Sequence, residues 1–482
     1  MKRLRLLIDN FLIYGLSGIL GKLLPFIFLP VITRLLPDPY YMGVNDILNT
    51  IISFSSAIAV MGMYDAMFRL FFDKEDDIFR LEICSSALFF VIITASLLFI
   101  LLIGFKRFIA GMVLRDSDLD NLIFICGISA FSHAVNNIIA APTRMLNKKK
   151  IYLIINLATA AASYAVVFVL LYGKAYLYAI PVGGMCSSLL SVCIFWILNR
   201  KWFSGHSVKK IHIKELLKIG APLFPGFLIY WIFNSCDRIM IARMLGMSYT
   251  GVYAVGSKFG QIGNLIYIAF AGGWQYFAFS TMKDMDQVEL TSKIFECLSF
   301  IEVCSTIFLS IASGYTFSLL FDERYSEAIK TIPYLFMAPL IQMLYQIGAN
   351  QFLVIKKTWP STLLLLSGAI VNISMNCILI PAMGIEGAAL ATLCGFFVST
   401  LTCVTCLSKM KLFSISWRCI YVFVGLMMFL LVWRKSIVSG KLILSAIAGL
   451  IIILMSVFLF RKEIKSVTGL WDRDHNVKRN SQ

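Results

Sequence analysis

Charged residues are scarce in this chain, where Asp, Glu, Lys and Arg make up 14% of 482 residues. Soluble domains carry about 25% charged residues, so the sequence does not predict one. Histidine occurs only four times. No G-x-x-x-x-G-K-[ST] sequence occurs either, so we expect no ATP hydrolysis through a P-loop.

Hydrophobic residues are correspondingly abundant, at 59% of the chain with a mean hydropathy of +0.83. A bilayer-spanning helix needs about 20 apolar residues. The basic start Met1–Arg5 precedes an apolar segment too long for a signal peptide, which we interpret as a retained first helix. The sequence predicts an all-α polytopic membrane protein with about fourteen spans, at 10–33, 42–64, 83–104, 121–142, 151–172, 176–198, 217–241, 251–279, 294–320, 331–355, 360–381, 386–408, 417–433 and 442–460.

The basic residues indicate the orientation of these spans. The 43 Lys and Arg outnumber the 26 acids, giving a net charge of +17. With the N-terminus inside, most Lys and Arg fall in the cytoplasmic segments, including the run Lys148–Lys150. This asymmetry predicts that both termini are cytoplasmic. The basic excess therefore reflects topology, and we expect no nucleic-acid partner.

The twelve cysteines lie almost entirely within apolar segments, which is typical of packing residues. Cys403 and Cys406 form a C-x-x-C, but no second pair or histidine is near them. We expect no metal site and no cofactor.

An internal repeat is visible in the sequence. Arg34-Leu35-Leu36-Pro37 with Gly43-Val44 recurs as Arg243-Met244-Leu245-Gly246 with Gly251-Val252, and Gly173–Leu177 is echoed by Gly384–Ala388. We predict a six-helix lobe at 1–200, a second at 201–410, and two further helices with a cytoplasmic tail at 411–482. Parallel repeats of this kind suit alternating access.

The same residues carry a family resemblance. Gly15–Gly18 through Leu29-Pro30 to Thr33–Pro37, Asp237–Ile241 with Thr250–Val255, and Asn376–Pro381 with Gly384–Thr392 resemble bacterial polysaccharide flippases, which move O-antigen or capsule repeat units. That family lies within the multidrug/oligosaccharidyl-lipid/polysaccharide exporter superfamily. The resemblance spans essentially the whole chain.

This resemblance implies two six-helix bundles around a V-shaped central cavity. It also implies a transporter, not an enzyme, in the bacterial inner membrane, acting in lipopolysaccharide O-antigen or capsule synthesis. The implied cargo is an oligosaccharide repeat unit linked to undecaprenyl pyrophosphate within membrane lipid. A polysaccharide polymerase and a chain-length regulator are further implied partners.

Ionisable residues inside spans are candidates for cargo binding, because they are costly in lipid. Lys22 and Lys258 could contact a pyrophosphate, the alternative being lysines that snorkel to the interface. Asp237 and Arg238 are neighbours on one helix, and a structural role in interhelical contacts is equally open. Arg34 and Arg243 occupy equivalent repeat positions, where stabilising the helix ends is the favoured interpretation.

Two further residues are candidates for proton or ion coupling. Glu302 is a lone acid in a span and is either a proton carrier or satisfied by a serine or lysine across the bundle. His133 is either a proton relay or, as favoured, a hydrogen-bonded core residue.

Several functions stay open on the sequence alone. Drug exporters that take organic cations would favour buried carboxylates in their first helices, whereas the first span here has Lys22 and no acid. The favoured function is thus a flippase, with a cation-coupled multidrug exporter as the alternative. A peptidoglycan precursor as cargo, a scramblase and a structural scaffold also stay open. A membrane polymerase or ligase is disfavoured by short outer loops without acid or histidine clusters.

Overall fold

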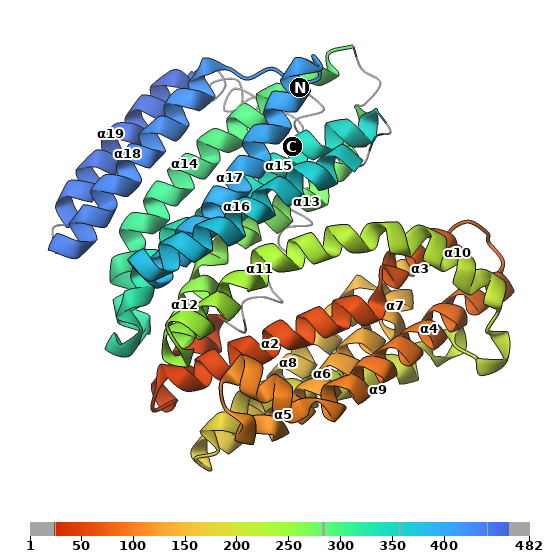
Figure 1. The fold of residues 1–482 in the computed structure, drawn as a ribbon. Coiled ribbons are helices and arrows are strands. Elements are labelled where there is room, and N and C mark those ends of the chain that lie inside the picture. The colour runs from red at the N-terminus through yellow and green to blue at the C-terminus, as the bar shows by residue number, and fades with distance from the viewer. Residues whose placement is uncertain are drawn as a thin grey trace, which may run out of the picture. The chain divides into compact units, whose positions relative to one another are not determined.

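The protein is helical throughout the residues that the computed structural model describes, which are 24, 26–281, 285–355, 357, 359–440 and 442–461. No strand occurs in these ranges. The helix Phe26–Leu35 comes first. The labelled α-helices that follow (Figure 1) are α2 Pro39–Val60, α3 Met63–Phe71, α4 Asp77–Gly104, α5 Lys106–Ile109, α6 Asp120–Ile139, α7 Ala141–Met145, α8 Lys149–Tyr172, α9 Tyr176–Asn199, α10 Lys210–Gly220, α11 Phe224–Met244, α12 Met247–Gly260, α13 Ile262–Ser280, α14 Gln287–Leu320, α15 Ile332–Val354, α16 Trp359–Met383, α17 Ile385–Lys409, α18 Trp417–Ser439 and α19 Leu442–Leu459.

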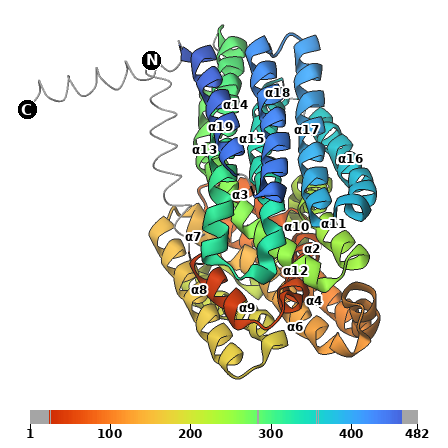
Figure 2. The same cartoon turned by 90° about the vertical axis from the view of Figure 1, so that its left-hand side faces the viewer.

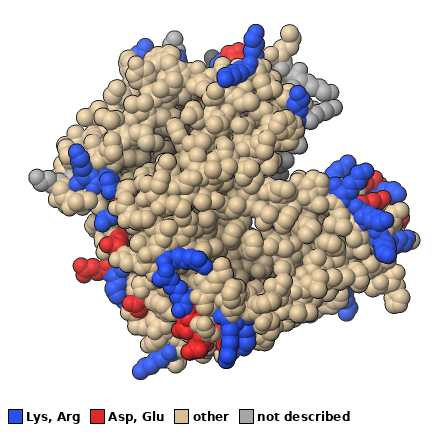
Figure 3. All heavy atoms as spheres, in the orientation of Figure 1, with Lys and Arg blue, Asp and Glu red and all other residues tan. Residues whose placement is uncertain are grey.

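Eleven helical segments within the described residues are long and apolar enough to cross a membrane. Two shorter apolar helices, Phe26–Leu35 and Ile443–Leu459, accompany them. Figure 3 shows charged side chains gathered in a few patches, with broad uncharged surface between them. The all-α, polytopic membrane fold is therefore confirmed.

Two of the predicted spans need correction at their ends or centre. The span predicted at 251–279 is divided at Gln261 into α12 and α13. The span predicted at 42–64 ends at Val60, because Met61 and Gly62 adopt left-handed conformations with φ of 44° and 72°. A left-handed residue cannot continue a right-handed helix, so the chain turns there and α3 begins.

The chain forms two compact units, and residues 21–254 make up the first. In this N-terminal unit α2 packs against α4, α6, α9 and α11, while α8 packs against α9 and α3 against α4 and α10. The start of α2 is fixed locally, since Asp38 caps the helix by accepting the Tyr40 backbone N–H and Pro39 occupies the first turn. The unit buries α2 among four neighbours and so places its polar side chains deep in the fold.

The second unit contains the described residues from Val255 onward. Here α17 packs against α15 and α16, and α14 packs against α15, α18 and α19. Figure 2 shows α14, α15, α17 and α18 running side by side. The second repeat echo lies at matching turns, between α8 and α9 and between α16 and α17. The predicted lobes at 1–200 and 201–410, and the appended segment at 411–482, stay predictions.

Helix α18 is tied to its neighbours in the second unit by polar contacts. Arg434 Nε lies 2.6 Å from Glu386 Oε1 on α17, and the Tyr334 hydroxyl of α15 donates to the same oxygen at 3.3 Å. Trp433 Nε1 donates to the Ser310 carbonyl of α14 at 2.9 Å. Glu386 is buried, so Arg434 supplies the charge that balances a carboxylate inside the helical bundle.

Candidate functional site

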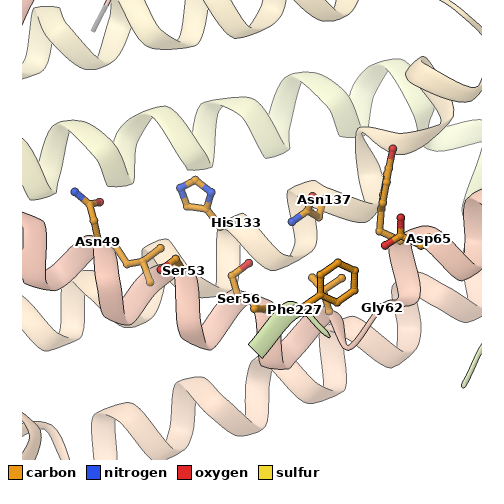
Figure 4. A pocket seen from close by; sticks show the side chains of 12 residues that line it. Asn49, Ser53, Ser56, Gly62, Asp65, His133, Asn137 and Phe227 are labelled. Carbon is orange, nitrogen blue, oxygen red and sulfur yellow. The ribbon is translucent and has the colours of Figure 1, made fainter. Parts of the chain in front are cut away.

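A pocket of about 540 Å³ opens in the N-terminal unit, and we call it the polar pocket. Small-molecule sites are typically roughly 300–1,000 Å³. Its walls come from α2, α3, α6 and α11 and from the turn between α2 and α3, as Figure 4 shows. The lining residues are Asn49, Ile52, Ser53, Ser56, Ala57, Val60, Gly62, Tyr64, Asp65, His133, Asn137 and Phe227.

Three polar side chains of this pocket have unused hydrogen-bonding groups. Asn49 of α2 and His133 and Asn137 of α6 are solvent-accessible, and within the described part of the chain none of them makes a hydrogen bond. Figure 4 shows these side chains extending from the two helices into one space. Amide and imidazole groups at membrane depth require a polar partner, so these side chains are available to bind water or a polar ligand. His133 is thus exposed to the pocket and makes no hydrogen bond to the described residues, and its role as a proton relay or a hydrogen-bonded residue stays a prediction.

The pocket ends at Tyr64 and Asp65 on α3. The Arg144 guanidinium stacks on the Tyr64 ring at 4.6 Å and on the Tyr152 ring at 5.0 Å. Partial burial raises the pKa of the Asp65 carboxyl group above its ordinary value, and the nearby Arg144 charge offsets this in part. Asp65 contributes an ionisable carboxyl group to the pocket lining. Arg144 is not a lining residue, but it packs on the Tyr64 ring.

Arg238 and Asp237 take separate partners, as their adjacent positions on α11 require. Arg238 Nε lies 2.7 Å from Asp46 Oδ2 on α2, and both side chains are largely buried. Asp237 accepts a hydrogen bond from the Tyr253 hydroxyl of α12. The structure thus assigns interhelical contacts to both residues, and their cargo-binding role stays a prediction.

Sequence reasoning did not single out Asp46, the partner of Arg238. A signal was present, because Asp46 is an acid inside the predicted span 42–64. Such residues usually pair with one another or line a polar cavity. The polar residues Asn49 and Asn137 were missed for a different reason, since uncharged amides in apolar helices carry no motif.

The two repeat-related arginines, Arg34 and Arg243, are both exposed. Arg34 lies in the last turn of the apolar helix Phe26–Leu35, and Arg243 lies in the last turn of α11. Arg243 donates to the Met112 carbonyl at 3.3 Å, and its own carbonyl accepts from Arg115. These positions agree with a role at helix ends, and substrate contact by either arginine stays a prediction.

The structure describes one of the two lysine candidates. Lys22 lies outside the described residues. Lys258 is half-buried in the last turn of α12. Cargo binding by these lysines stays a prediction.

Glu302 is fully buried in α14. Neither of its carboxylate oxygens has a hydrogen-bond partner, and the Thr306 hydroxyl one turn away donates to no acceptor in the described ranges. Ser299 and Ser310 continue this buried stripe along the helix. Proton coupling by Glu302 stays a prediction, and the serine or lysine partner of the alternative interpretation is absent from the described residues. A group of three or more His, Cys, Asp or Glu suited to a metal ion was also not found there.

A sequence model of the family described as "polysaccharide biosynthesis protein" matches residues 31–330. This range is more than half of the chain. The chain belongs to this family. The predicted resemblance to polysaccharide flippases is thereby confirmed at the level of the family.

One curated relative is an uncharacterized membrane protein of Methanocaldococcus jannaschii. It is 23% identical over 258 residues, which are 51% of each of the two chains. The chain thus spans about half the length of this relative.

Two kinds of solved structure share the fold. A lipid II flippase, MurJ, in an inward closed conformation has a TM-score of 0.70 at 16% identity, covering 94% of this chain and 100% of that one. A multidrug resistance MATE family transporter of the MOP superfamily, in an inward-facing conformation, has a TM-score of 0.64 at 13% identity, covering 81% and 94%. This member of the polysaccharide biosynthesis protein family therefore has the fold of known flippases and transporters.

Proposed function

We propose that this protein is a flippase for oligosaccharide repeat units linked to undecaprenyl pyrophosphate. It moves them from the cytoplasmic to the periplasmic leaflet of the bacterial inner membrane by alternating access, with both termini in the cytoplasm. The product feeds surface polysaccharide synthesis, as O-antigen or capsule, through a polymerase and a chain-length regulator. Transport draws on an ion gradient, the membrane potential or the cargo gradient, because the sequence has no P-loop.

The family match over residues 31–330 carries this proposal, since that family is described by polysaccharide biosynthesis. The fold adds support, because a similar chain of known structure is named for flipping lipid II. A polar pocket among the helices of the N-terminal unit supplies a third argument. Polar side chains at membrane depth have a high free-energy cost, and they commonly serve a function there.

A multidrug exporter is the second candidate, because a MATE transporter also shares the fold. Asp65 in the polar pocket is the observation in its favour, since an acid can attract an organic cation. The remaining polar groups of that pocket are uncharged amides, hydroxyls and an imidazole. These groups suit a ligand with many hydroxyl groups better than a hydrophobic cation.

Deletion of the gene in its host tests the two candidates. For a flippase, lipid-linked repeat units accumulate on the cytoplasmic face and surface polysaccharide is lost, and the wild-type gene restores both. Normal surface polysaccharide with altered drug sensitivity would instead establish the exporter.

Lysine variants then test the predicted contacts to pyrophosphate. We expect Lys22→Ala and Lys258→Ala to restore surface polysaccharide poorly at equal protein level. Lys214→Ala is the matched control, because Lys214 is exposed on α10. Full rescue by both test variants would remove the lysines from the binding site without removing the flippase.

A further inference from the structure

The polar pocket has more hydrogen-bonding capacity than the protein itself uses. Asn49, His133 and Asn137 carry both donors and acceptors, and all three have no hydrogen-bond partner within the residues the structure describes. The Ser56 hydroxyl adds to the same wall, whereas the Ser53 hydroxyl already donates to the Thr50 carbonyl and accepts from the Trp231 indole. Because Asn49, His133 and Asn137 are exposed to the pocket and make no hydrogen bond to the described residues, the wall offers donors and acceptors on several sides to a ligand that enters.

Aromatic rings bound the pocket where the polar wall ends. Tyr64 of α3 and Phe227 of α11 both line it. Arg144 stacks on Tyr64, which fixes the orientation of that ring. A saccharide presents hydroxyl groups at its edge and C–H groups on its faces, so it can satisfy amides and pack against rings at once.

The charges of the lining restrict the saccharide further. Asp65 is the one acid among the lining residues that the structure describes, and no Lys or Arg is among them. The Arg144 cation lies behind Tyr64, between two rings. An anion entering the pocket would meet Asp65, which the Arg144 cation behind Tyr64 offsets only in part, and like charges in a partly desolvated site repel.

We propose that the polar pocket is a saccharide subsite that takes an uncharged sugar of the cargo and disfavours an acidic one. This proposal rests on the proposed function, because the cargo is the lipid-linked oligosaccharide. The diphosphate binds outside this pocket. Asp65 acts as an acceptor for sugar hydroxyls and as the group that repels carboxylate-bearing sugars.

Photocrosslinking in the host tests occupancy of the pocket. A benzophenone amino acid replaces Asn137, and in the control it replaces Phe124, which is exposed on the same helix, α6. After metabolic labelling of sugars, we expect label on the protein at position 137 at least about tenfold above position 124. Equal labelling at both positions, or labelling at neither position while the protein is expressed, overturns the proposal.

Charge discrimination is measured on purified protein in lipid nanodiscs. The probes are dodecyl maltoside and dodecyl glucuronide, which share the alkyl chain and differ in charge. We expect the neutral probe to bind about tenfold more tightly, a difference of about 1.4 kcal/mol. In Asp65→Asn this preference should shrink to less than about threefold, because the repulsion is gone. Tighter binding of the glucuronide by the wild type overturns the proposal.

Two outcomes separate this proposal from the proposed function. If deletion traps lipid-linked repeat units but position 137 captures no sugar, the subsite is wrong and the flippase stands. If the pocket binds tetraphenylphosphonium and Asp65→Asn abolishes that binding, the saccharide subsite is overturned and the exporter is favoured.

Discussion

Gly43 and Gly251 pack against each other's helices in a reciprocal way. A Cβ atom on Gly43 would lie 1.9 Å from the Met247 carbonyl oxygen, and one on Gly251 would lie 1.9 Å from the Pro39 carbonyl oxygen. Each carbonyl belongs to the residue four positions before the opposite glycine. Because these glycines are the matching positions of the internal repeat, the two copies meet at a local two-fold relationship between α2 and the start of α12.

Substitution of either glycine should prevent this close approach. We expect Gly43→Ala or Gly251→Ala to destabilise the protein by at least the roughly 1–3 kcal/mol typical of overpacking, because backbone atoms cannot move aside easily. The double variant should cost less than the sum, since the first methyl already separates the helices. Thermal unfolding in detergent measures this. Gly226→Ala is the control, because no atom lies within 4 Å of its added Cβ.

The Asp46–Arg238 ion pair should be a strong structural contact. Asp46→Ala leaves a largely buried guanidinium without its carboxylate partner, and we expect a loss of about 3–5 kcal/mol in the free energy of unfolding. The exposed pair of Arg69 and Asp73 is the comparison, where Asp73→Ala should cost less than about 1 kcal/mol. Equal melting temperatures for Asp46→Ala and Asp73→Ala would contradict this prediction.

Glu302 is predicted to couple transport to protons. We expect Glu302→Gln to fold normally, because glutamine has nearly the same shape and a neutral side chain is less costly than an unpaired charge at a buried position. Transport of lipid-linked repeat units into everted vesicles should then lose its dependence on an imposed pH gradient. Glu289→Gln on the same helix is the control, since Glu289 is exposed and pairs with Lys293. A retained dependence in Glu302→Gln would show that protons are carried elsewhere.

The predicted orientation can be checked with epitope tags. A tag inserted after Asp116 should be detected on intact spheroplasts, because the loop before α6 is expected outside. A tag inserted after Asn147 should be detected only after permeabilisation, because it precedes the basic run Lys148–Lys150. The opposite pattern would place both termini in the periplasm.

The sequence was sufficient to predict the class of fold. Long apolar stretches such as 83–104 and 386–408 leave no alternative to membrane helices, since backbone groups in lipid must be satisfied internally. Local breaks were harder to predict. The division at Gln261 has no proline or charge to mark it, and the end of α2 depends on the left-handed Met61 beside Gly62.

The site was predicted less completely than the fold. A charged side chain within a span has a high free energy in lipid, and this criterion identified Arg238 and Glu302 as candidates. The same criterion would also have identified Asp46. Asn49 and Asn137 become notable only when α2 and α6 bring them to one pocket. These two residues are far apart in sequence, and spacing along one helix does not predict which neighbouring helix each side chain will face.

The contact between Arg434 and Glu386 has a consequence for evolution and engineering of the chain. A protein shortened after residue 410 would keep the carboxylate of Glu386 and lose the guanidinium that balances it. The same cut would expose the Ser310 carbonyl that Trp433 covers. The helices α18 and α19 therefore contribute to the charge balance of the helices they pack against, and a protein shortened in this way would be expected to favour an uncharged residue at position 386.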